Sequence, residues 1–261
     1  MTARAIWKGD LKLGSTRLPL KLYSAVEDKS VRFHILDDTK RQRVKQHMVD
    51  PETGDEVETK DIRKAYEIEP GRFVIVEEEE LEAIKPEPSR DIEISGFVAI
   101  DDIPQQYYDR PYYLGPNGDS SNYFALAKAL EKQKREGIAH WVMRNKTYYG
   151  ALSTQDGYLI LSTLRNAGEV ILAKELSKPS GASPTRKELE LAEHLVSLLE
   201  DEFNPKEFKD EYRERVLDFI ARKAKGHTPR LAPVKKKRKT TSLDSVLAKS
   251  IASLKKGKRA A

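Results

Sequence analysis

A series of short β-like segments, separated by turn clusters, restricts the fold of this chain more than any other feature. From Ala5 to Leu172 the segments are rich in β-branched and aromatic residues, and they include FVIV, DIEISGFVAI, AHWVMRN, YYGALST and YLILSTL. The turn clusters between them are PETGDE, EPGR, GPNGD and TQDG. One helix is predicted at 122–136, with Gly137 as its stop and with Ala125, Leu126, Ala129 and Leu130 on one face. Many short strands with one inserted helix predict a β-rich (α+β) fold with a barrel over residues 1–178.

Two helices are predicted at 184–226, after the boundary cluster KPSGASPT. In the first, Thr185 and Glu188 have the spacing of a capping box, and the face expected to be buried carries Leu189, Ala192, Leu195, Val196 and Leu199. In the second, Asn204 caps, Pro205 takes the first helical position, Glu207 completes a box and Gly226 ends the helix. Its apolar stripe is either core or a partner contact, and it consists of Phe208, Tyr212, Val216, Phe219 and Ile220.

The last residues of the chain carry a concentrated positive charge. Residues 221–261 hold 14 Lys and Arg and one acid, Asp244, whereas the first 220 residues hold 33 Lys and Arg and 41 Asp and Glu. A run of like charge predicts a disordered basic tail at 227–261 that binds a polyanion, with a simple solubility tail as the alternative. A membrane is the poorer partner, because the chain has no long apolar run and no lipidation motif. Within the tail, a short amphipathic stretch carries Leu243, Val246, Leu247, Ile251 and Leu254 on one side and is marginal as an isolated helix.

The sequence favours a binding protein over an enzyme. It has no Walker loop, GxGxxG, GxSxG or DxDxG motif, and its acidic run VEEEELEAIKPEPSR is typical of a solvated helix start. There is no cysteine, which excludes thiolate metal sites and fits a reducing cytoplasm, and the five histidines are scattered. We therefore expect no catalytic residue, no metal and no cofactor.

A long polar hairpin is predicted at about 37–66. If residues 39–48 form a strand, Arg41, Arg43, Lys45 and His47 project to one face, because side chains alternate along a strand. The return segment, after the turn PETGDE, brings Lys60, Arg63 and Lys64. Basic side chains at alternating positions contact phosphates without reading bases, which predicts sequence-independent DNA binding. The alternative is a solvated edge flap whose charges oppose aggregation.

The chain resembles bacterial Ku, the DNA end-binding family of non-homologous end joining. The residues that carry the resemblance run in order from about Arg4 to Gly226, and they include RAIWKGDLKLGSTRLPLKLYSAVEDKSVRFHIL, KAYEIEPGRFVIVEEEELE, PYYLGP, RNKT and FNPKEFKDEYRERVLDFIARKAKG. The resemblance implies a homodimer of β-barrel protomers whose hairpins form a ring around a double-stranded DNA end. It also implies a C-terminal region that recruits an ATP-dependent DNA ligase, ligase D, and a cytoplasmic, nucleoid-associated location.

Candidate DNA-binding residues follow from the resemblance by position. Arg41, Arg43, Lys45, Lys60, Arg63 and Lys64 would line the ring, and Arg144 and Lys146 in the RNKT turn would face the duplex from the barrel. The tail adds Lys235, Lys236, Lys237, Arg238 and Lys239. Many members of the family carry a cysteine pair near the hairpin tip, where this chain has QHMVDPETGDE, and this departure argues against a metal there.

Two other functions remain open at this point. A DNA-packaging protein of the nucleoid would share the charge-driven binding but would bind closed circular and linear DNA alike. A nuclease or nucleotidyl transferase would need an acidic metal cluster or a KxDG lysine, and no KxDG occurs.

Overall fold

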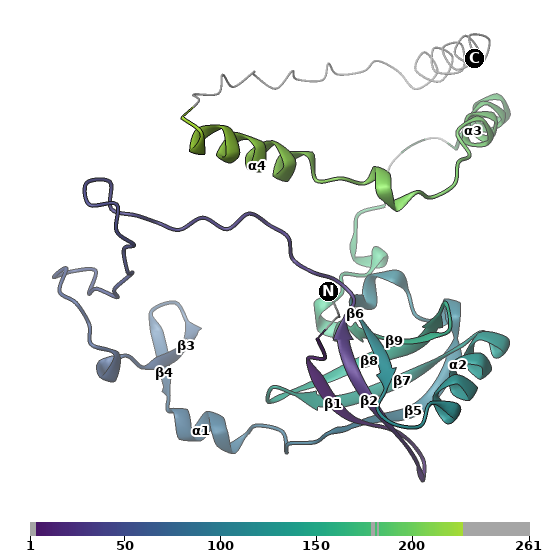
Figure 1. Ribbon diagram of the computed structural model, residues 1–261, viewed down its shortest axis with the longest axis horizontal. Coiled ribbons are helices and arrows are strands. Elements are labelled where there is room, and N and C mark those ends of the chain that lie inside the picture. Colours follow the sequence, from purple (N-terminus) through teal and green to yellow (C-terminus); the bar gives the residue numbers. More distant parts are fainter. Residues whose placement is uncertain (1–3, 179–180, 182, 227–261) are drawn as a thin grey trace. The chain divides into compact units, whose positions relative to one another are not determined.

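The computed structural model describes residues 4–178, 181 and 183–226, and its central element is a closed seven-stranded barrel (Figure 1). The strand order around the barrel is β1-β2-β6-β9-β8-β7-β5. Neighbouring strands are antiparallel except β1 and β5, whose parallel pairing closes the barrel. The strands are β1 Trp7–Leu13, β2 Thr16–Ser24, β5 Asp91–Ala99, β6 Tyr108–Pro116, β7 Arg135–Met143, β8 Lys146–Gln155 and β9 Tyr158–Leu164. The predicted barrel is confirmed.

Side chains from all seven strands face the barrel interior, and β2 shows the pattern most clearly. In β2, Leu18, Leu20 and Leu22 are buried, whereas the residues between them face outward. In β9, Leu159, Leu161 and Thr163 are buried, and Ile160 is buried as well. The alternation of buried and exposed residues along β2 is therefore the division between the inner and outer faces of the barrel.

Helix α2, Ser121–Gln133, contributes to the same core from outside the sheet. It buries Tyr123, Ala127 and Leu130, which recur at helical spacing. The Tyr123 hydroxyl donates to the Leu114 carbonyl at 2.6 Å and accepts from the Leu159 amide at 2.8 Å, so it joins α2 to β6 and β9. The helix predicted in this region is confirmed, with shorter bounds.

The predicted stop of this helix at Gly137 is wrong. The helix ends at Gln133, and Lys134 takes the left-handed conformation, with φ 50°, that turns the chain into β7. Gly137 is a buried residue of β7 instead. The turn was missed because a lysine replaced the usual glycine at the left-handed position.

The remaining elements lie outside the barrel sheet. A separate two-stranded sheet pairs β3, Lys64–Glu69, with β4, Arg72–Val76, which contains the predicted FVIV segment, and α1, Glu78–Ala83, follows it. Short 3-10 helices are found at Thr59–Asp61, Ile100–Asp102, Gln105–Tyr107, Ala167–Glu169, Ala173–Glu175 and Pro205–Glu207. In the described ranges, no helix combines the length and apolar character needed to cross a bilayer.

Residues 183–226, the last described range, contain two α-helices, α3 at Arg186–Leu198 and α4 at Glu211–Ala224. The predicted capping box of α3 is present. The Thr185 hydroxyl accepts a hydrogen bond from the Glu188 amide, and the Glu188 carboxylate accepts one from the Thr185 amide. Asn204 and Pro205 begin only a 3-10 turn, and α4 itself begins later with Asp210 as its cap. Gly226 has φ 81° just after α4, as its predicted role at the helix end requires.

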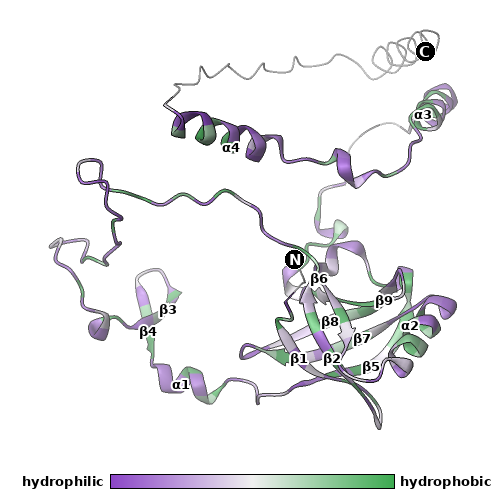
Figure 2. Ribbon diagram, viewed as in Figure 1, coloured by the Kyte–Doolittle hydropathy of each residue, from purple (hydrophilic) through white to green (hydrophobic). Residues whose placement is uncertain are grey.

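The predicted burial of the α3 face is wrong for this structure. Leu189, Val196 and Leu199 are exposed, as are Phe208 and Tyr212 of the second predicted stripe. Figure 2 shows hydrophobic and hydrophilic residues on both helices, which is the amphipathic pattern that led to the prediction. The pattern identified the face correctly, but no described residue covers it well enough to bury a side chain of α3 or α4.

Candidate nucleic-acid interface

A long insertion between β2 and β5 holds most of the candidate DNA-binding residues. The chain leaves the barrel after Ser24 and returns at Asp91. We call residues 34–90 of this insertion the arm. No residue of the arm is buried. Side chains without burial contribute little to the stability of the barrel, so the arm is a surface with another purpose.

The predicted strand at 39–48 is not formed. Only isolated bridges, Leu36 with Arg43 and Val49 with Glu56, pair backbone in this part of the arm. The Asp37 carboxylate accepts from the Lys40 amide, and Arg41 turns the chain with φ 57°. Asp followed by polar residues favours such a side-chain-supported turn over a strand. Arg41 and Arg43 therefore do not belong to one straight row of alternating side chains.

The second reversal of the arm occurs at the predicted turn PETGDE. Asp50 accepts hydrogen bonds from the backbone amides of Glu52 and Thr53, which lower the pKa of its carboxyl group. Gly54 has φ 78°, a conformation that glycine adopts without strain. Beside this turn the His47 ring contacts the Glu56 carboxylate. The turn is confirmed, although the segments on either side of it do not form a continuous ladder of backbone hydrogen bonds.

The candidate cations of the arm differ in their partners. Arg41 lies 3.6 Å from Asp38, Lys60 lies 2.7 Å from Glu58, and Arg63 lies 3.6 Å from Glu77. In contrast, Arg43, Lys45 and Lys64 have no ion pair within the described ranges. Exposed ion pairs contribute little stability and are screened by salt, so all six cations are available to an anionic ligand.

The arm also exposes many large apolar side chains, which the sequence interpretation underestimated when it described the hairpin as polar. They occur throughout the arm and include a run of three in β4, and they comprise Ile35, Leu36, Val44, Met48, Val49, Ile62, Tyr66, Ile68, Phe73, Val74, Ile75 and Ile84. Exposed apolar residues at this density are typical of an interaction surface.

Arg144 and Lys146 lie at a tight turn between β7 and β8. Arg144 and Asn145 have φ 51° and 62°, and Met143 pairs with Lys146 across them. Two central residues with positive φ make the two-residue hairpin turn that suits twisted strands. The predicted RNKT turn is confirmed, and the Arg144 and Lys146 side chains are exposed.

Strand register places this turn at the end of the barrel where the arm begins and ends. β5 begins opposite the end of β7, since Ile92 pairs with Trp141. β2 ends beside the beginning of β1, since Leu22 pairs with Trp7. The β1–β2 and β8–β9 turns lie at the opposite end of the barrel. The arm is therefore attached to the barrel at the same end as the RNKT turn.

A group of charged side chains secures the point where the arm returns. The Arg17 guanidinium donates to both carboxylate oxygens of Asp91, at 3.1 and 3.2 Å, and lies 3.3 Å from Asp10. Lys12 donates to Glu93 at 2.9 Å, and this bond raises the pKa of Lys12 and lowers that of Glu93. Sequence analysis did not identify these residues, because their partners lie more than 70 positions away.

No site for a metal ion is formed by the described residues, since no three His, Asp or Glu side chains gather suitably. The tail candidates Lys235, Lys236, Lys237, Arg238 and Lys239 lie outside the described residues. The described part of the candidate interface therefore consists of the arm and the RNKT turn.

Comparisons with known proteins show which family this chain resembles. The family model described as the Ku70/Ku80 beta-barrel domain matches residues 12–191. The chain is 37% identical to the non-homologous end joining protein Ku of Coxiella burnetii over 231 residues, which cover 86% of this chain and 84% of that protein. It is 38% identical to the protein of the same name from Anaeromyxobacter sp. over 226 residues, 86% of this chain and 76% of that one. It is 36% identical to non-homologous end joining protein Ku 2 of Geotalea uraniireducens over 262 residues, 98% of this chain and 99% of that one. With the family domain spanning more than half of its length and relatives this similar, the chain belongs to the Ku family.

Proposed function

We propose that this protein binds double-stranded DNA ends, without sequence preference, as a ring-shaped homodimer in non-homologous end joining. The observation that carries the proposal is the arm, whose residues 34–90 include no buried residue and combine exposed cations with exposed large apolar side chains. The names of the relatives support the pathway. The protein acts by binding, and the chemistry of joining belongs to a partner enzyme.

The β3–β4 sheet supports the homodimer. Side chains alternate between its faces, so Tyr66 and Val74 lie on one face, while Phe73 and Ile75 lie on the other. Tyr66 is 69% exposed and Phe73 is 61% exposed, so neither face is covered in the single chain. A two-stranded sheet is at best marginally stable alone. A second copy of the arm supplies apolar surface of the same kind, as a symmetric dimer requires.

The cations support DNA as the ligand. Arg43, Lys45 and Lys64 of the arm, with Arg144 and Lys146 of the turn, present charges that are not neutralised by ion pairs in the described part of the chain. Exposed Lys and Arg side chains contact phosphates, which carry no sequence information. Two arms closed by their apolar residues would surround the duplex, and such a ring can load only where the duplex ends.

The tail adds affinity without selecting ends in this proposal. Lys235, Lys236, Lys237, Arg238 and Lys239 contact phosphates beside the ring and contribute to association with the nucleoid. End selection remains with the ring, because it depends on topology.

The C-terminal helices recruit the ATP-dependent ligase, ligase D. The exposed aromatic residues Phe203 and Phe208, whose ring centroids lie 5.1 Å apart, and Tyr212 at the start of α4 provide an apolar contact surface. Reversal of charge on α4, Arg213→Glu with Arg215→Glu, tests its charged face. Normal ligase stimulation by a folded double variant would mean that this face is not the docking surface.

A gel shift that compares linear and closed circular DNA of one length tests the main proposal. We expect binding to the linear form and negligible retention on the closed circle at physiological salt. Equal affinity for the two forms would instead support the packaging protein of the nucleoid and exclude the threaded ring.

A further inference from the structure

We propose that the amphipathic stretch of the tail, residues 243–254, docks on the exposed apolar face of α3 in its own chain. DNA bound by the adjacent basic cluster at 255–259 would release it. The docking itself does not depend on the proposed function, whereas its release by DNA does.

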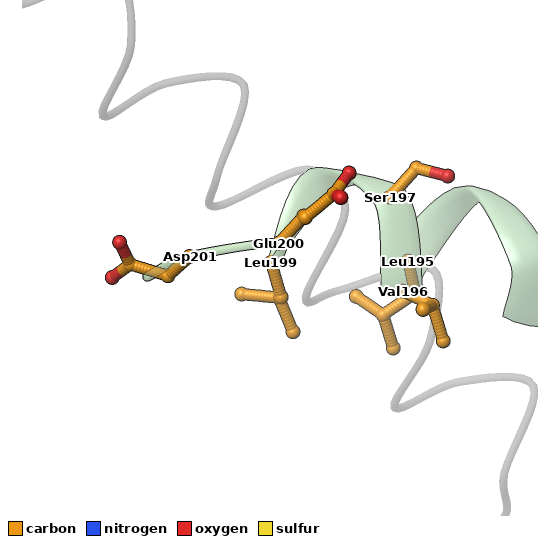
Figure 3. Close-up of a pocket in the computed structure, with 6 residues that line it drawn as sticks. All are labelled: Leu195, Val196, Ser197, Leu199, Glu200 and Asp201. Carbon is orange, nitrogen blue, oxygen red and sulfur yellow. The ribbon is translucent and has the colours of Figure 1, made fainter. Parts of the chain in front are cut away.

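The acceptor is a shallow apolar hollow at the C-terminal end of α3. It has a volume of about 620 Å³ and is lined by Leu195, Val196, Ser197, Leu199, Glu200 and Asp201. Figure 3 shows Leu195, Val196 and Leu199 projecting to one side of the ribbon. Val196 is 72% exposed and Leu199 is 57% exposed. A helix of 13 residues is marginal in water without a packed face, so this face requires a cover.

The length of the tail stretch matches that of the α3 face. From Leu189 to Leu199 the face extends about 15 Å, and Leu243 to Leu254 as a helix extends about 16 Å, at 1.5 Å per residue. In the stretch Leu243, Leu247, Ile251 and Leu254 recur at spacings of four, four and three, which makes one helical face. Two apolar stripes of equal length can cover each other completely.

Charge selects this occupant and its direction. Residues 186–202 hold two basic and six acidic side chains, whereas residues 243–259 hold five basic side chains and one acid. The acids 200–202 follow the end of α3 and the cations 255–259 follow the end of the stretch. Parallel pairing therefore brings the cations to the acids and also to the negative end of the α3 dipole. It brings Asp244 to Arg186 and Lys187 at the other end.

The connection is long enough for the stretch to return to α3. Residues 227–242 separate α4 from the stretch, and 16 residues span up to roughly 55 Å when extended. Docking within one chain is then favoured by the high effective concentration of a tethered segment.

Competition with DNA follows from the same charges. The cations at 255–259 cannot pair with the acids of α3 and with phosphates at once. DNA binding would therefore uncover α3, which makes its apolar face available for a partner only on a protein that is loaded on DNA.

Hydrogen exchange of the α3 amides, measured at low salt without DNA, tests the docking. Four proteins are compared: the full chain, a chain truncated after Gly226, the full chain with Leu247→Glu, and the full chain with Ser245→Glu. At helical spacing Ser245 would fall on the side opposite Leu247, so its variant controls for the added charge. We expect exchange at least about tenfold slower in the full chain and the Ser245 variant than in the other two. Equal exchange in all four proteins would overturn the docking.

Cross-linking distinguishes the chain's own tail from that of a second copy. The chain has no cysteine, so Ala192→Cys with Ser250→Cys gives one reactive pair for a short bismaleimide. We expect a product of monomer mass on a denaturing gel, and a product of dimer mass would overturn docking within one chain.

The DNA step has its own measurement. Adding a short blunt duplex should raise α3 exchange in the full chain to the level of the truncated chain. If α3 stays protected while DNA is bound, release by DNA is wrong. If no DNA binds, the proposed function fails and the docking result without DNA still stands.

Discussion

Replacing Phe73 by serine should separate the protomers of the proposed homodimer. Phe73 lies on β4 in the arm, pairs with Glu67 of β3 and is 61% exposed in the single chain. Because it packs against so little of its own chain, the substitution should leave the barrel folded. The substitution should therefore weaken the contact between the two arms of the dimer.

The size of the effect follows from the exposed area. A phenylalanine presents roughly 200 Å², of which 61% is exposed, so about 120 Å² can be buried by a partner. At about 25 cal/mol per Å² this corresponds to about 3 kcal/mol for each copy. A symmetric dimer loses the contact twice, so up to about 6 kcal/mol is lost. The costs of association, such as the lost freedom of the two protomers, offset part of the free energy calculated from buried area. We therefore expect the dimer Kd to rise at least about a hundredfold.

Sedimentation velocity over a range of protein concentrations, without DNA, measures this Kd. Tyr158→Ser is the matched control, because Tyr158 is 55% exposed but lies on barrel strand β9. The control should sediment as the unaltered protein does. An unchanged dimer Kd for a folded Phe73→Ser variant would refute the assignment of the β3–β4 sheet to the dimer contact.

Three further outcomes are expected. Arg41→Glu with Arg43→Glu should weaken end binding at least about tenfold in a fluorescence anisotropy titration, because two phosphate contacts become repulsive, while the dimer persists; unchanged affinity would exclude the arm as the DNA surface. Truncation after Gly226 should flatten the plot of log affinity against log salt by several units, about 0.9 for each lost phosphate contact, yet keep the preference for linear DNA; an unchanged slope would reduce the tail to a solubility role. Burial raises the pKa of the Glu136 carboxyl group above 4.5, so the folded protein binds this proton more tightly than the unfolded chain does. The stability that this proton contributes is therefore lost as pH rises through the raised pKa. Glu136→Gln should therefore gain stability relative to the unaltered protein at pH 8 and little at pH 4 in urea unfolding, and equal differences at the two pH values would contradict this.

The barrel could be predicted because its signal is local. The segments that form β7, β8 and β9 are rich in β-branched and aromatic residues, and turn residues stand between the strands, so local composition identified them. The stop of α2 could not be predicted from Gly137, because Lys134 adopts the left-handed conformation that the sequence rules assign to glycine.

The arm could be predicted in position but not in form. Alternating cations at 41, 43 and 45 suggested a strand, yet a strand needs a backbone partner, and the Asp37 turn competes successfully with it. The apolar residues of α3 were assigned to a core for a related reason. Periodicity shows which face needs a cover, but it does not show which segment provides that cover.

Because the parallel β1–β5 pair closes the barrel, the arm can fold and unfold independently of the barrel. The chain leaves from β2 and returns to β5, which flank β1 on either side, so none of the seven barrel strands comes from residues 34–90. Two transitions should then be seen on heating: loss of the arm at a temperature that rises with protein concentration, and melting of the barrel at a temperature that does not. Dilution alone would make the arm sensitive to trypsin while the barrel remained intact, so the cell could remove unassembled protomers by cutting one exposed segment.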